Sequence, residues 1–534
     1  MGASAGRVRR RGARQHVRPV VAATLGLALL VGCTGSEPSP TATTDRPEAS
    51  GPPTPTASAI ERFPAPAQCT AGSPGLKAAA TSSTVVDRSE DVGRTWAGMY
   101  VGQSLLTTET DQYVAYYDPD RVMTIAQRKI GVNGLPVSGW THRALDSTLG
   151  WDSHNYVTLA VDRDNALHVS GNMHGTPLEY FRTQPGGNID TLARVPTMVE
   201  NTPEDRVTYP VFLRQGNGGL FFYYRDGGSG DGSTFMNRYD EKSKSWSSVV
   251  DGQLFDGNGS TQDPHGDWNA YQTQPTFGPD GFFHMLWVWR DTPDVATNSV
   301  LTYARTKDFV QWYAADGTPL TLPFRHGEGD VVDPVPSGGG LVNGLQAIGF
   351  GSRNRVVVTY SKYDAHGNVQ LWAAEPDEGG DWRTHQLTTW DNPMEFEGTG
   401  TLSIPFGVAG AEANDDGTLS IEYSCHGARQ TLTVDESFAF VSQSGRAPVY
   451  PRALTDVRGN DPALGARVAV DLGESYGFDP KHTYVLRWET LGTNHDEPRE
   501  TWPKDGTALT VALLEDPRGG SPKPFPETHG GQNG

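Results

Sequence analysis

The chain has 534 residues, including 63 glycines, 38 prolines and 13 tryptophans, and aromatic residues make up 10% of it. This composition is typical of a turn-rich β protein rather than a helical one, and the length allows a large core. The formal net charge of -20 speaks against nucleic acid as the main partner, because phosphate binding requires a basic surface.

The N-terminus has the sequence pattern of an export signal. Five arginines within residues 7–14 precede an apolar run over 20–31, which ends in the sequence LVGC at Cys33. This segment resembles a bacterial lipoprotein signal, which implies that residues 1–33 are a signal peptide with a lipobox and that Cys33 receives the lipid. We therefore expect an exported protein that is lipid-anchored to the outer face of the cell membrane. The alternative, an uncleaved transmembrane helix, would need about 20 apolar residues, and the run over 20–31 is shorter than that.

Three further regions follow the signal. Residues 34–66 consist mainly of Pro, Thr, Ser and Ala with scattered charges, so they cannot bury a core and are predicted to form a disordered tether. Residues 67–515 are expected to fold into one β domain. Residues 516–534 are poor in apolar side chains and are predicted to be a flexible tail.

Two cysteines remain after the lipidated one. Cys69 precedes the first expected strands and Cys425 lies near the end of the folded part. In an oxidising compartment these thiols can join the two ends of the domain in a disulfide, and the alternative is a pair of unpaired buried thiols.

The folded region alternates short strands with turns rich in Gly, Asp, Asn and Pro, at the spacing of propeller strands. Several segments share one plan, in which a strand, an Asp- or Gly-rich turn and an aromatic-rich strand lead to a third strand near a tryptophan. Turns are expected at 162–165, 279–281 and 415–417, because Asp, Asn and Gly tolerate positive φ. The prediction is an all-β, seven-bladed β-propeller, with a two-sheet sandwich of the jelly-roll type as the alternative. The strand-bearing segments are 112–130, 155–183, 209–227, 274–291 with 299–313, 355–375, 404–424 and 482–491.

A further motif lies ahead of these segments. Residues 89–96 fit S-x-D-x-G-x-T-W, the Asp-box that is found in sialidase-type propellers. We expect it to form a folded hairpin turn with a structural role and no part in catalysis.

Two histidines lie in loops of one expected hairpin. His154 and His174 have Gly, Asn or Ser as neighbours, whereas His168 stands inside the apolar sequence ALHVS and is interpreted as a packed strand residue. The next segment supplies Tyr209 and Arg225. Glycines follow Arg225, which allows close approach of a ligand, and its planar guanidinium matches a carboxylate. Taken singly, Tyr209 is also explained as a strand aromatic and Arg225 as a solvated turn charge.

Together these motifs carry a family resemblance. The sequences WDSHNYVTLAVDRDNALHVSGNMHGTPLEYFRT, VTYP, FFYYRDGGSGDG and HMLWVWRDTP resemble the BNR-repeat-containing family of the sialidase-like β-propeller superfamily, which includes ulvan lyases and related polysaccharide lyases. The resemblance extends from about Trp96 to Arg499. It implies a seven-bladed propeller whose central cleft cuts a uronic-acid polymer by β-elimination.

The resemblance also implies roles for individual residues. His154, His174, Tyr209 and Arg225 match the catalytic and carboxylate-neutralising groups of such lyases, and Tyr271 matches a substrate-contacting position. From the same motifs we expect four more residues to contact substrate: Asn155, Asn172, Arg290 and Asn298. The family often shows Asn-His where this chain has Asn298-Ser299, so a substrate-contacting imidazole is absent there.

β-Elimination explains why these residue types are needed together. The proton beside a carboxylate is weakly acidic, so a cation must stabilise the enolate-like state, and Arg225 is the candidate. A base removes the proton, either a neutral His154 or an ionised Tyr209, and Tyr209 is the candidate acid for the departing oxygen. His174 would position the sugar or share the carboxylate.

We therefore predict an extracellular lyase of an ulvan-like acidic polysaccharide, acting as a monomer. No cofactor is required by this scheme and no metal site is predicted, although a structural metal ion stays open. One alternative is a glycan-binding lipoprotein without turnover. The other is a sialidase-like glycoside hydrolase, but such enzymes rely on an arginine cluster, a tyrosine nucleophile and carboxylates, and the sequence does not show this set in order.

Overall fold

In the computed structural model, the described residues are 66–69, 84–214, 219–257, 268–399, 402, 404–473 and 481–515. The predicted signal peptide, most of the tether and the tail lie outside them. The described part is almost entirely β, and its longest helix is the single turn α1 (Arg452–Thr455). Three 3-10 turns complete the helical structure of these ranges: η1 (Ile189–Thr191), η2 (Val295–Thr297) and η3 (Ser352–Asn354). No helix among the described residues is long and apolar enough to cross a membrane.

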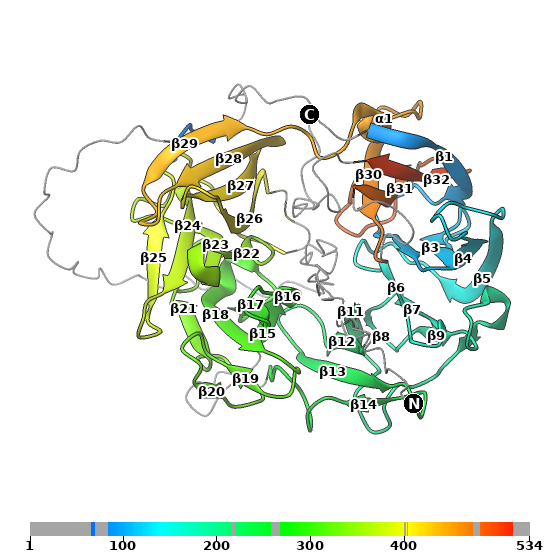
Figure 1. The fold of residues 1–534 in the computed structure, drawn as a ribbon, viewed down its shortest axis with the longest axis horizontal. Helices are drawn as coiled ribbons and strands as arrows, with labels where there is room; N and C mark the ends of the chain where they lie inside the picture. The colour runs from blue at the N-terminus through cyan, green and yellow to red at the C-terminus, as the bar shows by residue number, and fades with distance from the viewer. Residues whose placement is uncertain are drawn as a thin grey trace, which may run out of the picture.

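The strands form curled sheets arranged in a ring (Figure 1). The first sheet in chain order contains β2 (Ser104–Thr107), β3 (Asp111–Tyr117), β4 (Val122–Lys129) and β5 (Thr141–Thr148). The second contains β6 (Val157–Val161), β7 (Leu167–Gly171), β9 (Tyr180–Arg182) and β10 (Ala193–Arg194). The third contains β8 (His174–Thr176), β11 (Val207–Arg214), β12 (Leu220–Asp226), β13 (Ser233–Asp240) and β14 (Ser245–Ser248).

The sheets that follow are larger. One contains β15 (Asn269–Gln272), β16 (Thr276–Phe277), β17 (Phe283–Arg290), β18 (Asn298–Thr306), β19 (Trp312–Tyr313), β20 (Pro319–Leu320) and β21 (Asp330–Asp333). The next has eight strands, and the chain traces it in two groups of four. The groups are β22 (Gln346–Phe350), β23 (Val356–Tyr363), β24 (Val369–Pro376) and β25 (Trp382–Gln386), then β26 (Phe406–Ala413), β27 (Leu419–Cys425), β28 (Ala428–Val434) and β29 (Phe440–Gly445).

The last sheet joins the two ends of the folded chain. Its strand order is β1 (Thr84–Thr95), β32 (Thr507–Glu515), β31 (His482–Thr490) and β30 (Gly465–Val470). β1 pairs antiparallel with β32 from Thr84 opposite Glu515 to Thr95 opposite Thr507. The ring is therefore closed by hydrogen bonds between a strand that begins the sheets and the strand that ends them.

β1 also corrects one expectation. The Asp-box at residues 89–96 was predicted to be a hairpin turn, but its first seven residues lie in β1. Register shifts after Val85, Asp87 and Asp91 absorb extra residues while the pairing with β32 continues. Such bulges let an irregular sequence stay in a ladder. Here the gain in strand pairing at ring closure outweighs the local turn preference of the motif.

The three predicted hairpin turns are confirmed by their hydrogen bonds and dihedral angles. In the β6–β7 turn the Asn165 N–H donates to the Asp162 carbonyl at 3.1 Å, and Asn165 has φ 57°. Gly281 and Gly417 close the other two turns with φ 81° and 86°. Asn and Gly are the residues that enter this left-handed region at least cost.

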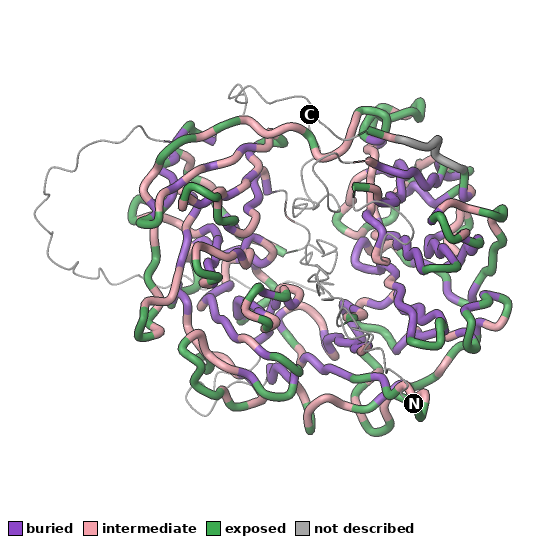
Figure 2. Tube along the Cα trace, viewed as in Figure 1, coloured by how far each residue is buried: buried purple, intermediate pink, exposed green. Residues whose placement is uncertain are grey.

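The core lies within and between the sheets, and exposed residues gather on the turns and outer strands (Figure 2). Every residue of β3 is buried, as expected for a strand covered on both faces. Trp287, Trp289, Trp312 and Trp390 are at most 1% exposed. Large aromatic side chains bury 150–250 Å² each, so they account for much of the apolar area removed from water.

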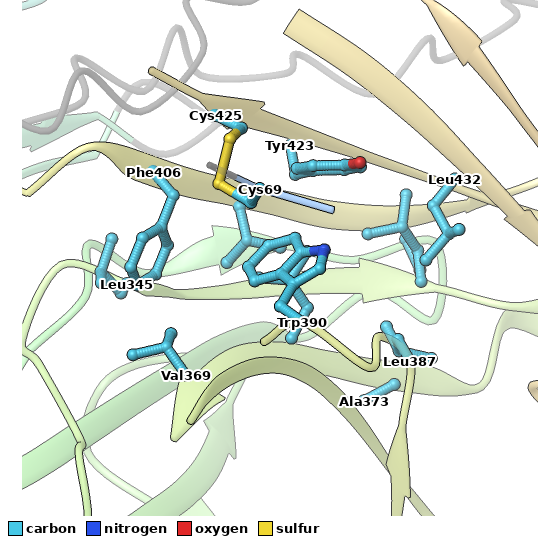
Figure 3. Close-up of a cluster of buried hydrophobic side chains, with 14 of the residues drawn as sticks. Cys69, Leu345, Val369, Ala373, Leu387, Trp390, Phe406, Tyr423, Cys425 and Leu432 are labelled. Carbon is cyan, nitrogen blue, oxygen red and sulfur yellow. A yellow bond between two sulfur atoms is a disulfide. The ribbon is translucent and has the colours of Figure 1, made fainter. Parts of the chain in front are cut away.

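Cys69 and Cys425 form a disulfide, with their Cα atoms 5.7 Å apart. The bond lies beside Trp390 and Phe406 in the core of the eight-stranded sheet (Figure 3). Hydrogen bonds also hold the segment, because the indole of Trp390 donates to the Ala67 carbonyl at 3.1 Å and the Asn392 amide donates to the Cys69 carbonyl at 3.0 Å. The residues just before the ring are thus fixed to a sheet other than the one that β1 joins.

One buried carboxyl lies at the junction between the closing sheet and the first sheet. Asp471, 2% exposed, accepts a hydrogen bond from the Thr107 N–H at 2.7 Å, and the Leu472 N–H donates to the Leu105 carbonyl at 2.8 Å. Burial raises the pKa of Asp471 to about 6, although hydrogen bonds from Thr107 and Gly473 oppose this.

We expect Asp471→Asn to stabilise the protein at neutral pH. Because the folded-state pKa lies above the usual 3.8, the carboxyl contributes most stability below pH 4 and loses about 3 kcal/mol of it as pH rises to 6. Asn keeps the acceptor for Thr107 but cannot ionise. Thermal unfolding of parent and variant from pH 4 to 7 should show a stability difference that grows in favour of the variant with pH. A difference that does not change with pH would contradict this.

Candidate functional site

The site begins in the loop between β5 and β6, which holds Asp152 and His154. The Asp152 carboxylate accepts a hydrogen bond from the His154 backbone N–H at 2.9 Å, and its Oδ1 also lies 2.6 Å from His154 Nδ1. A short Asp side chain that bonds the backbone two residues later forms an Asx turn. Sequence-local bonding therefore fixes where the His154 ring, 2% exposed, is placed.

The second histidine reaches the same carboxylate from another sheet. His174 is the first residue of β8, a three-residue strand that pairs with β11 rather than with β7. Its Nδ1 lies 2.7 Å from Asp152 Oδ2. The His154 and His174 rings stack with centroids 4.3 Å apart. One carboxylate thus bridges two stacked imidazoles.

This cluster determines the charge of its members. Burial raises the pKa of Asp152, but the hydrogen bonds from His154 and His174 outweigh it, so the pKa lies well below its usual range. Burial and the neighbouring His154 lower the pKa of His174, against the opposing effect of Asp152. At neutral pH Asp152 is therefore an anion, and His174 favours its neutral form.

Tyr209 faces both imidazoles. Its ring centroid lies 5.9 Å from that of His154 and 5.8 Å from that of His174. It sits in β11 at a register shift between Thr208 and Val211, with φ 55°. A tyrosine in the left-handed region is uncommon, and here the bulge redirects its side chain. Burial and the nearby Tyr271 raise the pKa of Tyr209, while Arg225 opposes them, so this phenol keeps its proton at neutral pH.

Beyond Tyr209, two arginines from neighbouring sheets approach one phenol. Arg225 on β12 has its Cζ 4.4 Å from the ring centroid of Tyr271 and 5.1 Å from that of Tyr209. Arg290 on β17 has its Cζ 4.3 Å from the Tyr271 ring, and its Nη1 lies 3.4 Å from the Tyr271 hydroxyl. All three residues are at most 2% exposed. The arrangement concentrates positive charge in a buried region.

The two guanidiniums reverse the effect of burial on Tyr271. Burial raises the pKa of its hydroxyl, but Arg290 and Arg225 and a hydrogen bond with Ser229 at 3.0 Å lower it overall. Relative to an ordinary phenol, the pKa of Tyr209 is therefore raised and the pKa of Tyr271 is lowered. Divergent pKa values of adjacent titratable groups are a feature of catalytic sites.

The structure brings together six of the nine predicted catalytic and substrate-binding residues: His154, His174, Tyr209, Arg225, Tyr271 and Arg290. Asn298 holds Arg290 by a hydrogen bond, since its Oδ1 accepts from Arg290 Nε at 2.8 Å.

The other predicted residues bond to the surrounding protein. The Asn172 amide donates to Ser147 Oγ at 2.9 Å and to the Thr148 carbonyl at 3.1 Å, which ties it to the end of β5. Asn155 is 9% exposed and its carbonyl accepts from the Tyr117 hydroxyl at 2.6 Å. His168, expected to pack in a strand, is fully buried with Nδ1 2.7 Å from the Tyr180 hydroxyl.

Sequence reasoning missed two carboxylates. Asp152 stands two residues before His154, a spacing that allows an Asx turn and could have indicated the contact. Asp496 lies between β31 and β32, and its Oδ1 accepts from the Ser153 N–H at 2.8 Å and from Ser153 Oγ at 2.7 Å. The two residues are 343 positions apart, so no local pattern could reveal this bond.

Two groups of described residues have the composition of a metal site. The ligand atoms of Asp152, His154 and His174 lie within 4.8 Å of one another, but both Nδ1 atoms are already at hydrogen-bond distance from the carboxylate. Cys69 and Cys425 lie near His426, but both sulfurs belong to the disulfide. We therefore assign no metal to either group.

A family model described as BNR repeat-containing family member matches residues 111–390, just over half of the chain. Among solved structures, the polysaccharide lyase Uly1 is similar over 78% of this chain and 90% of its own, with 13% identity and a TM-score of 0.52. A PL25 ulvan lyase bound to -[GlcA(1-4)Rha3S]- covers 80% and 96% at 11% identity, with a TM-score of 0.48. At such identities the likeness to Uly1 establishes a propeller-like fold and not an activity. A search of curated proteins found no match.

We expect Tyr271 to ionise below the range of ordinary tyrosines. The causes are the guanidiniums of Arg290 and Arg225. A spectrophotometric titration of tyrosinate should show a phenol that ionises below pH 10 in the parent, and Tyr271→Phe should remove it. Tyr224→Phe is the matched control, because Tyr224 is fully buried on β12 and its pKa is raised. An unchanged titration in Tyr271→Phe would contradict the electrostatic interpretation.

Proposed function

Because the chain belongs to the BNR repeat-containing family, we propose that it is a polysaccharide lyase that cleaves a uronic-acid polymer by β-elimination. One observation carries this proposal. The Tyr209 ring is near both members of a histidine pair, with centroids 5.8 and 5.9 Å away, and near Arg225, whose Cζ is 5.1 Å from it. A base, an acid and a cation are thus within reach of one sugar, which are the three groups that β-elimination requires.

The cation would bind the uronate. Within the described residues Arg225 donates to two backbone carbonyls, of Gly228 at 3.2 Å and Ala270 at 3.0 Å, rather than to a carboxylate. A substrate carboxylate would neutralise this buried charge, and the arginine would stabilise the enolate-like state. Arg290 adds a second positive charge next to the Tyr271 ring.

The acid and base follow from the protonation states. Tyr209 keeps its proton because burial raises its pKa, which favours the acid over the base role left open by the sequence. A histidine then takes the proton from the carbon beside the carboxylate, and the electron pair of that C–H bond forms the carbon–carbon double bond. The C–O bond to the leaving sugar breaks, and the Tyr209 hydroxyl protonates the departing oxygen. Atoms and charges balance without an external reactant.

The wider proposal concerns architecture and location. We propose seven blades, because the eight-stranded sheet consists of two four-stranded groups linked by one parallel bridge, Phe350 with Glu412. We further propose export and lipid anchoring at Cys33, with the enzyme a monomer outside the cell. The disulfide between Cys69 and Cys425 supports an oxidising compartment. An ulvan-like polymer of rhamnose and glucuronate is the first substrate to test.

A second candidate is a glycan-binding lipoprotein without turnover. Ser299 favours it, since this residue replaces the imidazole expected from the family pattern and is only 4% exposed. A ligand group that is missing would weaken catalysis while other contacts still bind the polymer.

The test is the ultraviolet absorbance of unsaturated uronate during incubation of residues 67–534 with a panel of uronate polysaccharides. We expect Tyr209→Phe to lower kcat by about 10²- to 10⁴-fold with little change in KM, because it removes the proton donor. Arg225→Ala should raise KM and lower kcat, because the carboxylate loses its cation. Tyr224→Phe, a buried tyrosine whose hydroxyl bonds the Pro203 carbonyl, is the matched control and should keep the parent's rate.

Each other outcome has a distinct meaning. New reducing ends without absorbance would identify a hydrolase and contradict the proposal. Binding to one polymer with a flat trace would support the glycan-binding candidate. Full activity in Tyr209→Phe would leave a lyase but remove Tyr209 from its mechanism.

A further inference from the structure

The centre of the histidine cluster is a carboxylate. Asp152 offers one oxygen to each imidazole, Oδ1 to His154 Nδ1 at 2.6 Å and Oδ2 to His174 Nδ1 at 2.7 Å. An ionised carboxylate can only accept hydrogen bonds. Both Nδ1 atoms must then carry the hydrogen, and in the neutral ring Nε2 is left as the proton acceptor.

The carboxylate is itself held in place from two sides. The His154 backbone N–H donates to Asp152 Oδ1 at 2.9 Å, which limits rotation of the side chain. The adjoining Ser153 donates twice to Asp496, which reaches in from the segment between β31 and β32. Asp496 Oδ2 also lies 3.7 Å from His154 Nδ1. These bonds fix the loop and the Asp152 carboxylate, and the carboxylate orients the two rings.

We infer that Asp152 is a positioning residue that fixes both histidines with Nδ1 protonated and so makes the pair a single proton acceptor through Nε2. The part that concerns catalysis rests on the proposed lyase function. One carboxylate charge compensates one imidazolium. The rings lie 4.3 Å apart, so a second positive charge would be repelled by the first.

The charged groups around the pair agree with uptake of one proton. Asp152 lies on the same loop as His154, Asp496 comes from the closing sheet, and Tyr209 comes from β11. Arg225 on β12, Tyr271 on β15 and Arg290 on β17 lie behind Tyr209 and act on it electrostatically. The anions Asp152 and Asp496 lie at the histidine Nδ1 atoms, whereas Arg225 contacts the Tyr209 ring. A proton taken from the substrate is therefore stabilised beside Asp152, away from the carboxylate-binding arginines.

The tautomers can be measured without substrate. Long-range ¹H–¹⁵N correlation spectra of residues 67–534 with ¹⁵N-labelled histidines report which ring nitrogen carries the hydrogen. The signals are assigned with the variants His154→Gln and His174→Gln. We expect Nδ1–H for both rings in the parent. In Asp152→Asn one ring should change tautomer, because an amide presents one acceptor and one donor where the carboxylate presents two acceptors. Hydrogen on Nε2 of either ring in the parent would overturn the inference.

The kinetic arm uses a matched pair of variants. Asp152→Asn should lower kcat by about a hundredfold. It should also move the acidic limb of the profile of kcat/KM against pH by about one pH unit to lower pH, because loss of the anion lowers the histidine pKa. Asp162→Asn is the control, since Asp162 is a buried carboxylate 3.8 Å from His168 Nε2 in the β6–β7 hairpin. It should keep the profile of the parent.

The two arms separate the inference from the function it rests on. An unshifted limb in Asp152→Asn, or an equal shift in Asp162→Asn, would overturn the positioning role. If the parent cleaves no polymer but both rings carry Nδ1–H, the lyase proposal fails and the assignment of the tautomers stands.

Discussion

The antiparallel pairing of β1 with β32 is the constraint on which the site depends. It joins residues near both ends of the described chain, from Thr84 opposite Glu515 to Thr95 opposite Thr507. β32 also ends the hairpin that carries Asp496, and Asp496 accepts both hydrogen bonds from Ser153 beside His154. Opening the ladder would therefore release the loop that positions the first histidine. The site is a property of the closed ring rather than of any single sheet, because its groups come from the third and fourth sheets, from the loop between β5 and β6, and from the loop between β31 and β32.

Irregular backbone appears where the site needs it. Tyr209 adopts φ 55° at a register shift in β11, and a non-glycine residue in such a conformation costs about 1–3 kcal/mol. The neighbouring Thr208 offsets part of this cost, since its hydroxyl donates to the Gly227 carbonyl at 2.8 Å and accepts from the Gly175 N–H at 2.7 Å. Those bonds connect β11 to β8, which holds His174, and to the turn that follows Arg225. The strand that carries the candidate acid is thereby held in register with the strands that carry the candidate base and cation.

The sequence could predict features that depend on a few adjacent residues. Turns at Asn165 and Gly281 follow from the φ preferences of Asn and Gly, and the all-β class follows from the repeated strand plan. The Asp-box failed as a turn because pairing with β32, more than 400 residues away, decided its conformation. The same limit applies to the site. The family motifs pointed to His154 and Tyr209, but the hydrogen bond between Ser153 and Asp496 spans 343 positions, and Asn172 and Asn298 are occupied by protein partners that only the fold reveals.

The buried arginines give an acidic protein a local site for the acidic polymer proposed above. The formal net charge of -20 acts at long range, and salt screens exposed charges beyond about 8–10 Å. Arg225 and Arg290 instead act from positions at most 2% exposed, where the effective dielectric is low and a short-range attraction is much stronger. Their effect on Tyr271, whose pKa falls although burial would raise it, is the effect that a local positive potential has on a buried phenol. A carboxylate placed beside the same two guanidiniums would experience the same potential. In the proposed lyase the net charge would therefore affect the rate of encounter, and the arginines would hold the bound polymer.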